Sequence, residues 1–217
     1  MFIGHYGVSY AANAKNRTVP LWVLFVAVQL LDVFWSIFVL LGIEKVRIVP
    51  GYTRTNPLDL YYMPYTHSLV GALGWSILAA VAYQLWKRGN SGSALVGVAV
   101  FSHWVLDFIV HAHDLPLLGD RYKVGLGLWN YPAIALGLEV VFLLGGLSWY
   151  LRASGGLRAP GTVGFVVFSI VLVGVQVFVF FGSPPSSPAA AALTALGSYV
   201  AFAGVAGWLD TRRRGNS

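Results

Sequence analysis

The chain of 217 residues is 57% hydrophobic and only 10% charged, and it contains no cysteine. So few charges cannot cover the surface of a soluble protein, and the lack of cysteine excludes disulfides and thiolate metal sites. The net charge of +6 comes from short basic clusters at the ends of apolar runs, which is typical of membrane topology and not of a nucleic-acid-binding face.

The N-terminal segment from residue 2 to 14 carries no charged side chain apart from a titratable His5, and it ends at Lys15 and Arg17. It is too short to cross a membrane, and it lacks the features of a signal peptide, so we expect residue 1 to belong to the mature protein. Two structures fit the pattern. A re-entrant helix would bring His5 to the middle of the bilayer, whereas an interfacial helix would lie along its surface.

Six apolar segments follow, and each is long enough to cross a hydrocarbon core about 30 Å thick, which requires roughly 20 residues. We therefore expect an all-α fold, a polytopic membrane helical bundle with the short N-terminal helix added. It would form a single domain over residues 1–217, with site-bearing helices in 1–151 and apolar scaffold helices in 161–209. The predicted spans are 19–43, 64–86, 92–112, 132–151, 161–182 and 189–209.

Lysine and arginine predict the orientation of these spans. Nine of them lie at the N-terminus, in the second and fourth loops and in the C-terminal tail, and five lie on the opposite side. Because cytoplasmic loops carry the excess of positive charge, both termini are expected to be cytoplasmic. Ten arginines against four lysines suggest a bacterial source, and hence a multi-pass protein of the bacterial cytoplasmic (inner) membrane.

Four of the predicted spans contain ionisable side chains, which are costly inside a membrane unless they are paired. At a rise of 1.5 Å per residue, four of these side chains fall in one layer, and the two outermost histidines lie slightly nearer the outer surface. Each is a candidate site residue. The six side chains are Asp32, His67, His103, Asp107, His111 and Glu139.

The stretch "FSHWVLDFIVHAHDLP" places His103, Asp107 and His111 at intervals of four residues, on one face of a helix. Imidazole and carboxylate groups are the usual ligands of zinc, manganese and iron, and two ligands at i and i+4 can hold one ion. A bound dication would also remove the cost of burying the carboxylates. The same pattern allows a plain ion pair between His103 and Asp107, and a lone membrane histidine is commonly a hydrogen-bond partner.

Four short motifs occur in order along the first half of the chain: "GH" at residues 4–5, "LLDVFW" in the first span, "YTHSL" before the second and "SHWVLD" in the third. Together they resemble the bacterial inner-membrane, metal-dependent hydrolase family, the LexA-regulated membrane hydrolases. The resemblance covers roughly residues 1–116. Carried over to this sequence, the family pattern falls on His5, Asp32, His67 with Ser68, and His103 with Asp107.

The resemblance implies a metal-dependent hydrolase, and the His-x-x-x-Asp helix is also similar to that of zinc-dependent phospholipases C. Two features depart from the family pattern. Asp32 lacks the second nearby carboxylate that the family commonly has, and "YMPY" replaces His-Arg-Gly-Phe before Thr-His-Ser. We therefore expect one divalent metal ion, zinc. Its expected ligands are His103, Asp107, Asp32, and His5 or His67.

The leading hypothesis is a membrane-embedded, metal-dependent hydrolase that acts on a lipid or a lipid-linked ester or phosphoester. A metal with an open position lowers the pKa of water, and Glu139 or His111 would transfer the proton as a catalytic residue. Arg54, Arg121 and Lys123 on the outer loops would bind an anionic head group of the substrate. Membrane lipid is thus the expected partner, nucleic acid is excluded, and the sequence indicates no particular protein partner.

Other functions of the same side chains remain open. A non-enzymatic transporter, or a protein that conducts ions or protons, could use them as a relay, and a haem held by two histidines is a third possibility. A nucleophilic Ser68 is disfavoured, because the adjacent His67 would point elsewhere on a helix and could not activate it. His113, Asp114 and Asp120 are expected to be solvated loop groups.

Overall fold

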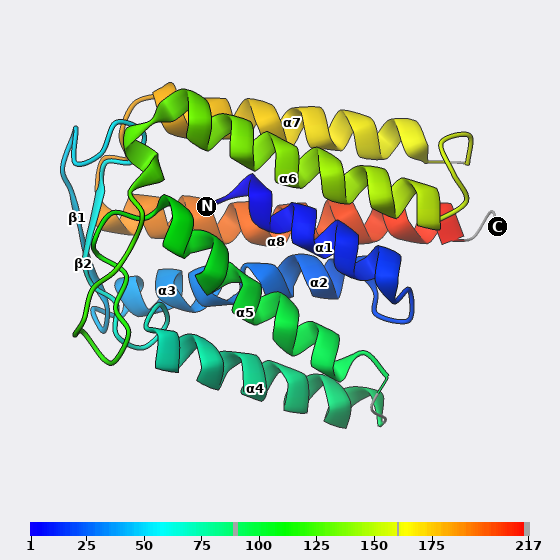
Figure 1. Ribbon diagram of the computed structural model, residues 1–217, viewed down its shortest axis with the longest axis horizontal. Helices are drawn as coiled ribbons and strands as arrows, with labels where there is room; N and C mark the ends of the chain where they lie inside the picture. Colours follow the sequence, from blue (N-terminus) through cyan, green and yellow to red (C-terminus); the bar gives the residue numbers. More distant parts are fainter. Residues whose placement is uncertain (89–90, 160, 215–217) are drawn as a thin grey trace.

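The computed structural model describes residues 1–88, 91–159 and 161–214, and within them it forms eight α-helices, one short 3-10 helix and one two-stranded hairpin. Five helices are long and apolar enough to cross a membrane, and a bent helix pair adds a sixth crossing if it counts as one span. The predicted all-α membrane bundle is thereby confirmed (Figure 1).

The helices correspond to the six predicted spans. Their ends follow local signals: Pro132 begins one helix, and Ser68 caps another by accepting a hydrogen bond from the Gly71 amide at 3.0 Å. Large apolar side chains on their outward faces are exposed, as lipid-facing residues would be. The spans are α2 (Leu21–Val28) with α3 (Leu30–Leu40), α4 (Leu69–Lys87), α5 (Ser93–Val110), α6 (Pro132–Ala153), α7 (Thr162–Phe181) and α8 (Pro188–Arg214).

The first span is broken at Gln29, where the axes of α2 and α3 differ by 54°. The break places Asp32 in the first turn of α3, where the positive end of the helix dipole favours a carboxylate. It also leaves the Val28 carbonyl at the end of α2, open to a donor from another helix. Hydropathy alone predicts one continuous span here, because both halves are equally apolar.

The N-terminal helix α1 (Ile3–Lys15) lies inside the bundle and packs chiefly against α6 (Figure 1). The two backbones approach closely at Gly7 and Gly146: a Cβ added to Gly146 would lie 2.0 Å from the Gly7 carbonyl oxygen. Small residues at such crossings permit close packing of membrane helices. His5 is therefore brought into the bundle, as the re-entrant helix predicts and the interfacial helix does not.

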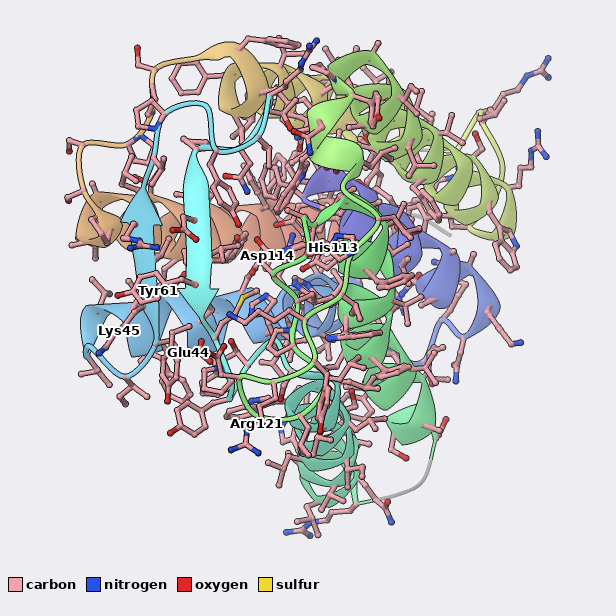
Figure 2. All side chains as sticks on the ribbon, turned by 60° about the vertical axis from the view of Figure 1, so that its left-hand side comes forward. Glu44, Lys45, Tyr61, His113, Asp114 and Arg121 are labelled. Atoms are coloured by element: carbon pink, nitrogen blue, oxygen red, sulfur yellow. The ribbon has the colours of Figure 1, made fainter. Side chains whose placement is uncertain are left out.

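A hairpin covers one end of the bundle, where the hydropathy pattern indicates only a loop. Strands β1 (Lys45–Ile48) and β2 (Leu58–Tyr62) pair antiparallel, and Arg47 forms an ion pair with Asp59 at 2.5 Å across them. Figure 2 looks at this end of the molecule, where Tyr61 lies on the hairpin and His113 and Asp114 lie on the loop that follows α5. This loop contains the 3-10 helix η1 (Leu128–Asn130).

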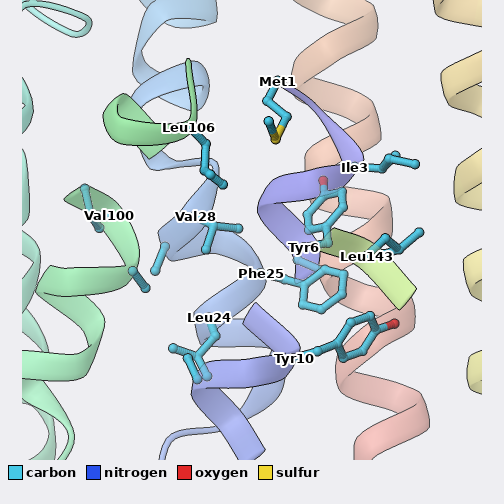
Figure 3. Packing of buried hydrophobic residues seen from close by; sticks show 14 of the residues in the cluster. Met1, Ile3, Tyr6, Tyr10, Leu24, Phe25, Val28, Val100, Leu106 and Leu143 are labelled. Carbon is cyan, nitrogen blue, oxygen red and sulfur yellow. The ribbon is translucent and has the colours of Figure 1, made fainter. Parts of the chain in front are cut away.

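The core between His5 and the end of α1 consists mainly of apolar and aromatic side chains from α1, α2 and α6 (Figure 3). The ring of Phe25 stacks on Tyr6 at 4.5 Å and meets Tyr10 edge-on at 5.3 Å. Burial of such rings supplies much of the packing energy of a helical core. This packing lies between His5 and the end of the bundle that carries Lys15.

Candidate metal centre

Asp107 on α5 lies at the centre of a buried group of imidazoles. Its Oδ2 atom is 3.1 Å from His103 Nε2 and 3.4 Å from His111 Nε2, and its Oδ1 atom is 3.2 Å from His5 Nε2. His67 Nε2 lies 3.8 Å from Oδ2. Two histidines four residues from Asp107, and two from distant parts of the chain, thus direct a ring nitrogen at one carboxylate.

Asp32 adds a second carboxylate from the start of α3. Its Oδ1 atom lies 3.2 Å from His67 Nε2 and 3.6 Å from His103 Nε2, and its Oδ2 atom accepts a hydrogen bond from Tyr199 on α8 at 2.8 Å. Two sets of three possible ligands share His103, and within each set the ligand atoms lie within 4.8 Å of one another. The sets are His5, His103 and Asp107, and Asp32, His67 and His103.

All five expected ligands and His111 therefore lie close together in the structure. We call these six residues the His/Asp cluster. Their roles as metal ligands or proton carriers stay predictions, since the structure establishes their positions only. The six residues are His5, Asp32, His67, His103, Asp107 and His111.

His103 is held in one tautomer by the broken first span. Its Nδ1 donates to the Val28 carbonyl at 2.6 Å, so Nε2 is left with its lone pair or with a second proton. Nε2 is buried and makes no hydrogen bond with any residue described, although Asp107 and Asp32 lie within 3.6 Å. Two carboxylates lie close to this ring nitrogen without a hydrogen bond to it. A cation bound between them and the nitrogen would explain that arrangement.

His67 lies just before α4 and is oriented by a short chain of hydrogen bonds. The Thr66 hydroxyl donates to Glu44 at 2.6 Å, so its oxygen accepts from His67 Nδ1 at 2.7 Å. His67 Nε2 then faces Asp32 with its lone pair. Glu44 also accepts the backbone amides of residues 65 and 66, and it is buried. No sequence pattern marked Glu44, because it follows the first span with no spacing relation to His67.

His111 is the first residue after α5, and it connects two carboxylates. Its Nδ1 lies 2.9 Å from Asp114 and its Nε2 lies 3.4 Å from Asp107. Burial lowers the pKa of His111, but Asp114 and Asp107 outweigh burial and raise the pKa to about 9. The expectation that Asp114 is solvated is wrong: the turn after α5 folds inward, and Asp114 is only 4% exposed.

Glu139 on α6 accepts the backbone amides of Phe2 and Gly4 at 2.9 Å and thereby holds the start of α1. The amino group of Met1, which is also buried, donates to Asp107. Glu139 thus fixes the helix that carries His5. Its role in proton transfer stays a prediction.

A cavity of about 840 Å³ opens beside the cluster, and Asp32, His67, Asp107, His111 and Glu139 contribute to its wall. Other parts of the wall include the hairpin turn, the C-terminal part of α7 and the N-terminal part of α8. A substrate of lipid size could therefore reach the side chains that face one another in the cluster.

Of the three cations expected to bind a head group, Arg54 lies on the cavity wall. Lys123 instead donates to the Tyr61 carbonyl at 2.7 Å and pairs with Asp120 at 2.9 Å, which ties the loop after α5 to the hairpin. Arg121 is exposed on that loop (Figure 2). Neither Lys123 nor Arg121 is among the described residues that line the cavity.

The geometry of the cluster fits a metal ion. Ligands about 2.0–2.2 Å from a tetrahedral ion such as zinc lie about 3.3–3.6 Å from one another. The nitrogen-to-oxygen distances around Asp107 and Asp32 begin at 3.1 Å and reach 3.8 Å. The fold and the cluster thus define a polytopic membrane protein with a buried His/Asp site that could bind a metal. Comparisons with protein-family models, curated proteins and solved structures gave no match.

Proposed function

We propose that this protein is a membrane-embedded hydrolase that uses one divalent metal ion, zinc, to cleave an ester or phosphoester of a lipid or lipid-linked substrate. The observation that carries the proposal is the orientation of His67 and His103. In each residue, Nδ1 donates a hydrogen bond to an acceptor outside the cluster, and Nε2 faces a carboxylate inside it. This arrangement is typical of metal-ligating histidines.

The roles of the residues follow from their positions. His103, Asp107 and Asp32, with His5 or His67, would hold the ion. A bound divalent ion supplies Lewis-acid chemistry, since it polarises a scissile bond and lowers the pKa of water.

His111 borders the cavity and lies between two carboxylates, so it holds a proton that it can pass to a leaving group. Glu139 also borders the cavity and is the second candidate for this proton transfer. Arg54 at the cavity wall would receive an anionic head group.

Membership of the LexA-regulated membrane hydrolase family is part of this proposal. The residues onto which the family pattern falls are far apart in the sequence, yet they meet in the structure. The convergence supports the resemblance without testing it.

We also propose that the protein lies in a bacterial cytoplasmic membrane, with the end that carries Lys15 and the C-terminus in the cytoplasm. The C-terminal ends of α1, α4, α6 and α8 all lie at that end of the bundle (Figure 1). Basic side chains gather there, as the positive-inside rule requires. Met1 itself lies within the bundle beside Asp107.

Two alternative functions are less well supported. A transporter needs a polar path on both sides of its site, whereas the described core towards Lys15 is mainly apolar and aromatic (Figure 3). A haem between two histidines needs their nitrogens to face each other across its plane. The His5 and His103 rings instead stack face to face at 4.0 Å.

Elemental analysis of detergent-purified protein tests the proposal. We expect one metal ion per chain in the wild type and a large loss in Asp107→Asn, together with loss of turnover of a panel of lipid esters and phosphoesters. The matched control is Asp120→Asn, because Asp120 pairs with Lys123 on the outer loop. Equally negligible metal in wild type and Asp107→Asn would overturn the proposal. Stoichiometric metal without hydrolysis would favour transport.

A further inference from the structure

The cavity beside the His/Asp cluster continues between the two helices that sequence analysis assigned to the scaffold. Val175 and Val179 line it from α7, and Ala191 and Ala195 line it from α8. Both helices satisfy the length and hydropathy of membrane spans. A passage between them therefore faces the acyl chains of the bilayer and not water.

The residues on this side of the cavity are of the kind that accommodates a hydrocarbon chain. Val179 and Phe178 on α7 are 50% and 68% exposed, so they stand at the lipid-facing edge of the cavity. On α8 most of the lining side chains are small, including Ala195 and Ser198, and Tyr199 is the large one among them. Apolar cavity walls favour an alkyl chain over a hydrated solute.

Gln176 is the exception among these apolar side chains. It lies within a strongly apolar run of α7, is 1% exposed and contributes to the cavity wall. Neither Oε1 nor Nε2 of its amide makes a hydrogen bond with any residue described. A buried amide without a partner is unfavourable, so its presence points to a ligand that supplies one.

We infer that the substrate is an ester-linked membrane lipid whose acyl chain lies between α7 and α8, and that Gln176 binds its ester linkage. This rests on the proposed function, since it places the scissile bond beside the His/Asp cluster. The Nε2 atom of the Gln176 amide is a donor that an ester carbonyl of such a lipid can accept. Arg54 at the cavity wall matches the charge of an anionic head group.

The lipid enters sideways from the bilayer in this arrangement. Its head group lies at the hairpin turn, which provides Arg54, and its linkage lies near the cluster. Its chain leaves past Val179 and Ala195. In that case α7 and α8, which the sequence predicted to be scaffold helices, would determine the lipid specificity through Gln176 and the space beside Ala195.

Photolabelling in detergent solution tests this binding mode without requiring turnover. One probe is a phosphatidylglycerol with a diazirine in its acyl chain, and the other is a diazirine alkane of equal chain length with no ester. The wild type should be labelled by the phospholipid at the lining residues of α7 and α8. Wild-type protein stripped of metal should be labelled equally, because the groove needs no metal.

Two substitutions separate the parts of the inference. Ala195→Phe should reduce groove labelling by both probes at least several-fold, and the gentler Ala195→Leu should reduce it less. Gln176→Met keeps length and removes the amide, so it should reduce phospholipid labelling several-fold and leave alkane labelling unchanged. The matched control is Val200→Phe, on the outward face of α8 and 66% exposed.

The outcomes for the groove and for the enzyme are distinguishable. The proposed acyl-chain site between α7 and α8 would be wrong if phospholipid labelling were spread evenly over the outward faces of these helices. It would also be wrong if labelling were unchanged in Ala195→Phe. If Gln176→Met changed labelling by both probes equally, the proposal that Gln176 binds the ester linkage would be wrong. Labelling confined to the groove in a protein that binds metal but hydrolyses no lipid would retain the binding mode and overturn the hydrolase.

Discussion

The ring nitrogens of His67 and His103 are each fixed by a partner outside the His/Asp cluster. Thr66, itself bound to Glu44, holds His67, and the Val28 carbonyl holds His103. Such partners select the tautomer and the ring orientation before a metal arrives, which reduces the conformational cost of binding. The metal affinity of the site should therefore depend on residues that never touch the ion.

Thr66→Val tests this dependence. Valine has nearly the shape of threonine but cannot accept from His67 Nδ1 or donate to Glu44. We expect the metal affinity to fall about 10-fold to 100-fold, the usual effect of removing such a partner. Competition titration against a metal chelator measures it. Thr211→Val, on the exposed end of α8, is the control. An unchanged affinity in Thr66→Val would show that His67 is not a ligand.

At the level of elements, α1 is the short helix that completes the cluster by supplying His5. It is held against α6 by the Gly7 and Gly146 crossing and by the Glu139 carboxylate at its start. Because His5 lies in the first turn of this short helix, any shift of α1 moves His5 relative to Asp107. Helix packing and ligand geometry are thus coupled.

Gly146→Ala should expose this coupling. The added methyl would lie 2.0 Å from the Gly7 carbonyl oxygen, so α1 must move away from α6. Overpacking of this kind costs about 1–3 kcal/mol of stability. We expect a lower melting temperature and a reduced metal content, measured by a thermal shift assay and by elemental analysis.

Gly145→Ala is the matched control for that substitution. A Cβ at Gly145 meets nothing within 4 Å, and alanine is the better helix former. Stability and metal content should equal or slightly exceed those of the wild type. If both alanine variants behaved alike, the close approach of α1 to α6 would have no energetic role.

For the molecule as a whole, an ion shared by α3, α5 and either His5 on α1 or His67 before α4 would link the bundle together. Ligand binding to the folded state adds about 2.7 kcal/mol at 100 times the dissociation constant. Chelation should therefore lower the melting temperature of the wild type by several degrees, with recovery when zinc is returned. Asp107→Asn should show no response to either treatment. A wild-type protein insensitive to chelation would contradict a metal that bridges these helices.

The sequence by itself determined the six apolar spans and their approximate ends, because hydropathy is a local property of the chain. It also placed His103, Asp107 and His111 on one face of α5. It could not determine the break at Gln29, since the two halves of that span are equally apolar. It gave no sign of the hairpin over residues 45–62.

Tertiary structure decided which groups meet. Tyr199 lies 167 positions from Asp32, yet its hydroxyl fixes one oxygen of that carboxylate. Glu44 and Asp114 are directed inward by the folding of loops, which carry no periodic signal. Gln176 becomes a candidate ligand-binding residue only because it borders the cavity, which the sequence does not show. Contacts between elements distant in the chain depend on how helices pack, and packing is a property of the whole molecule and of no single segment.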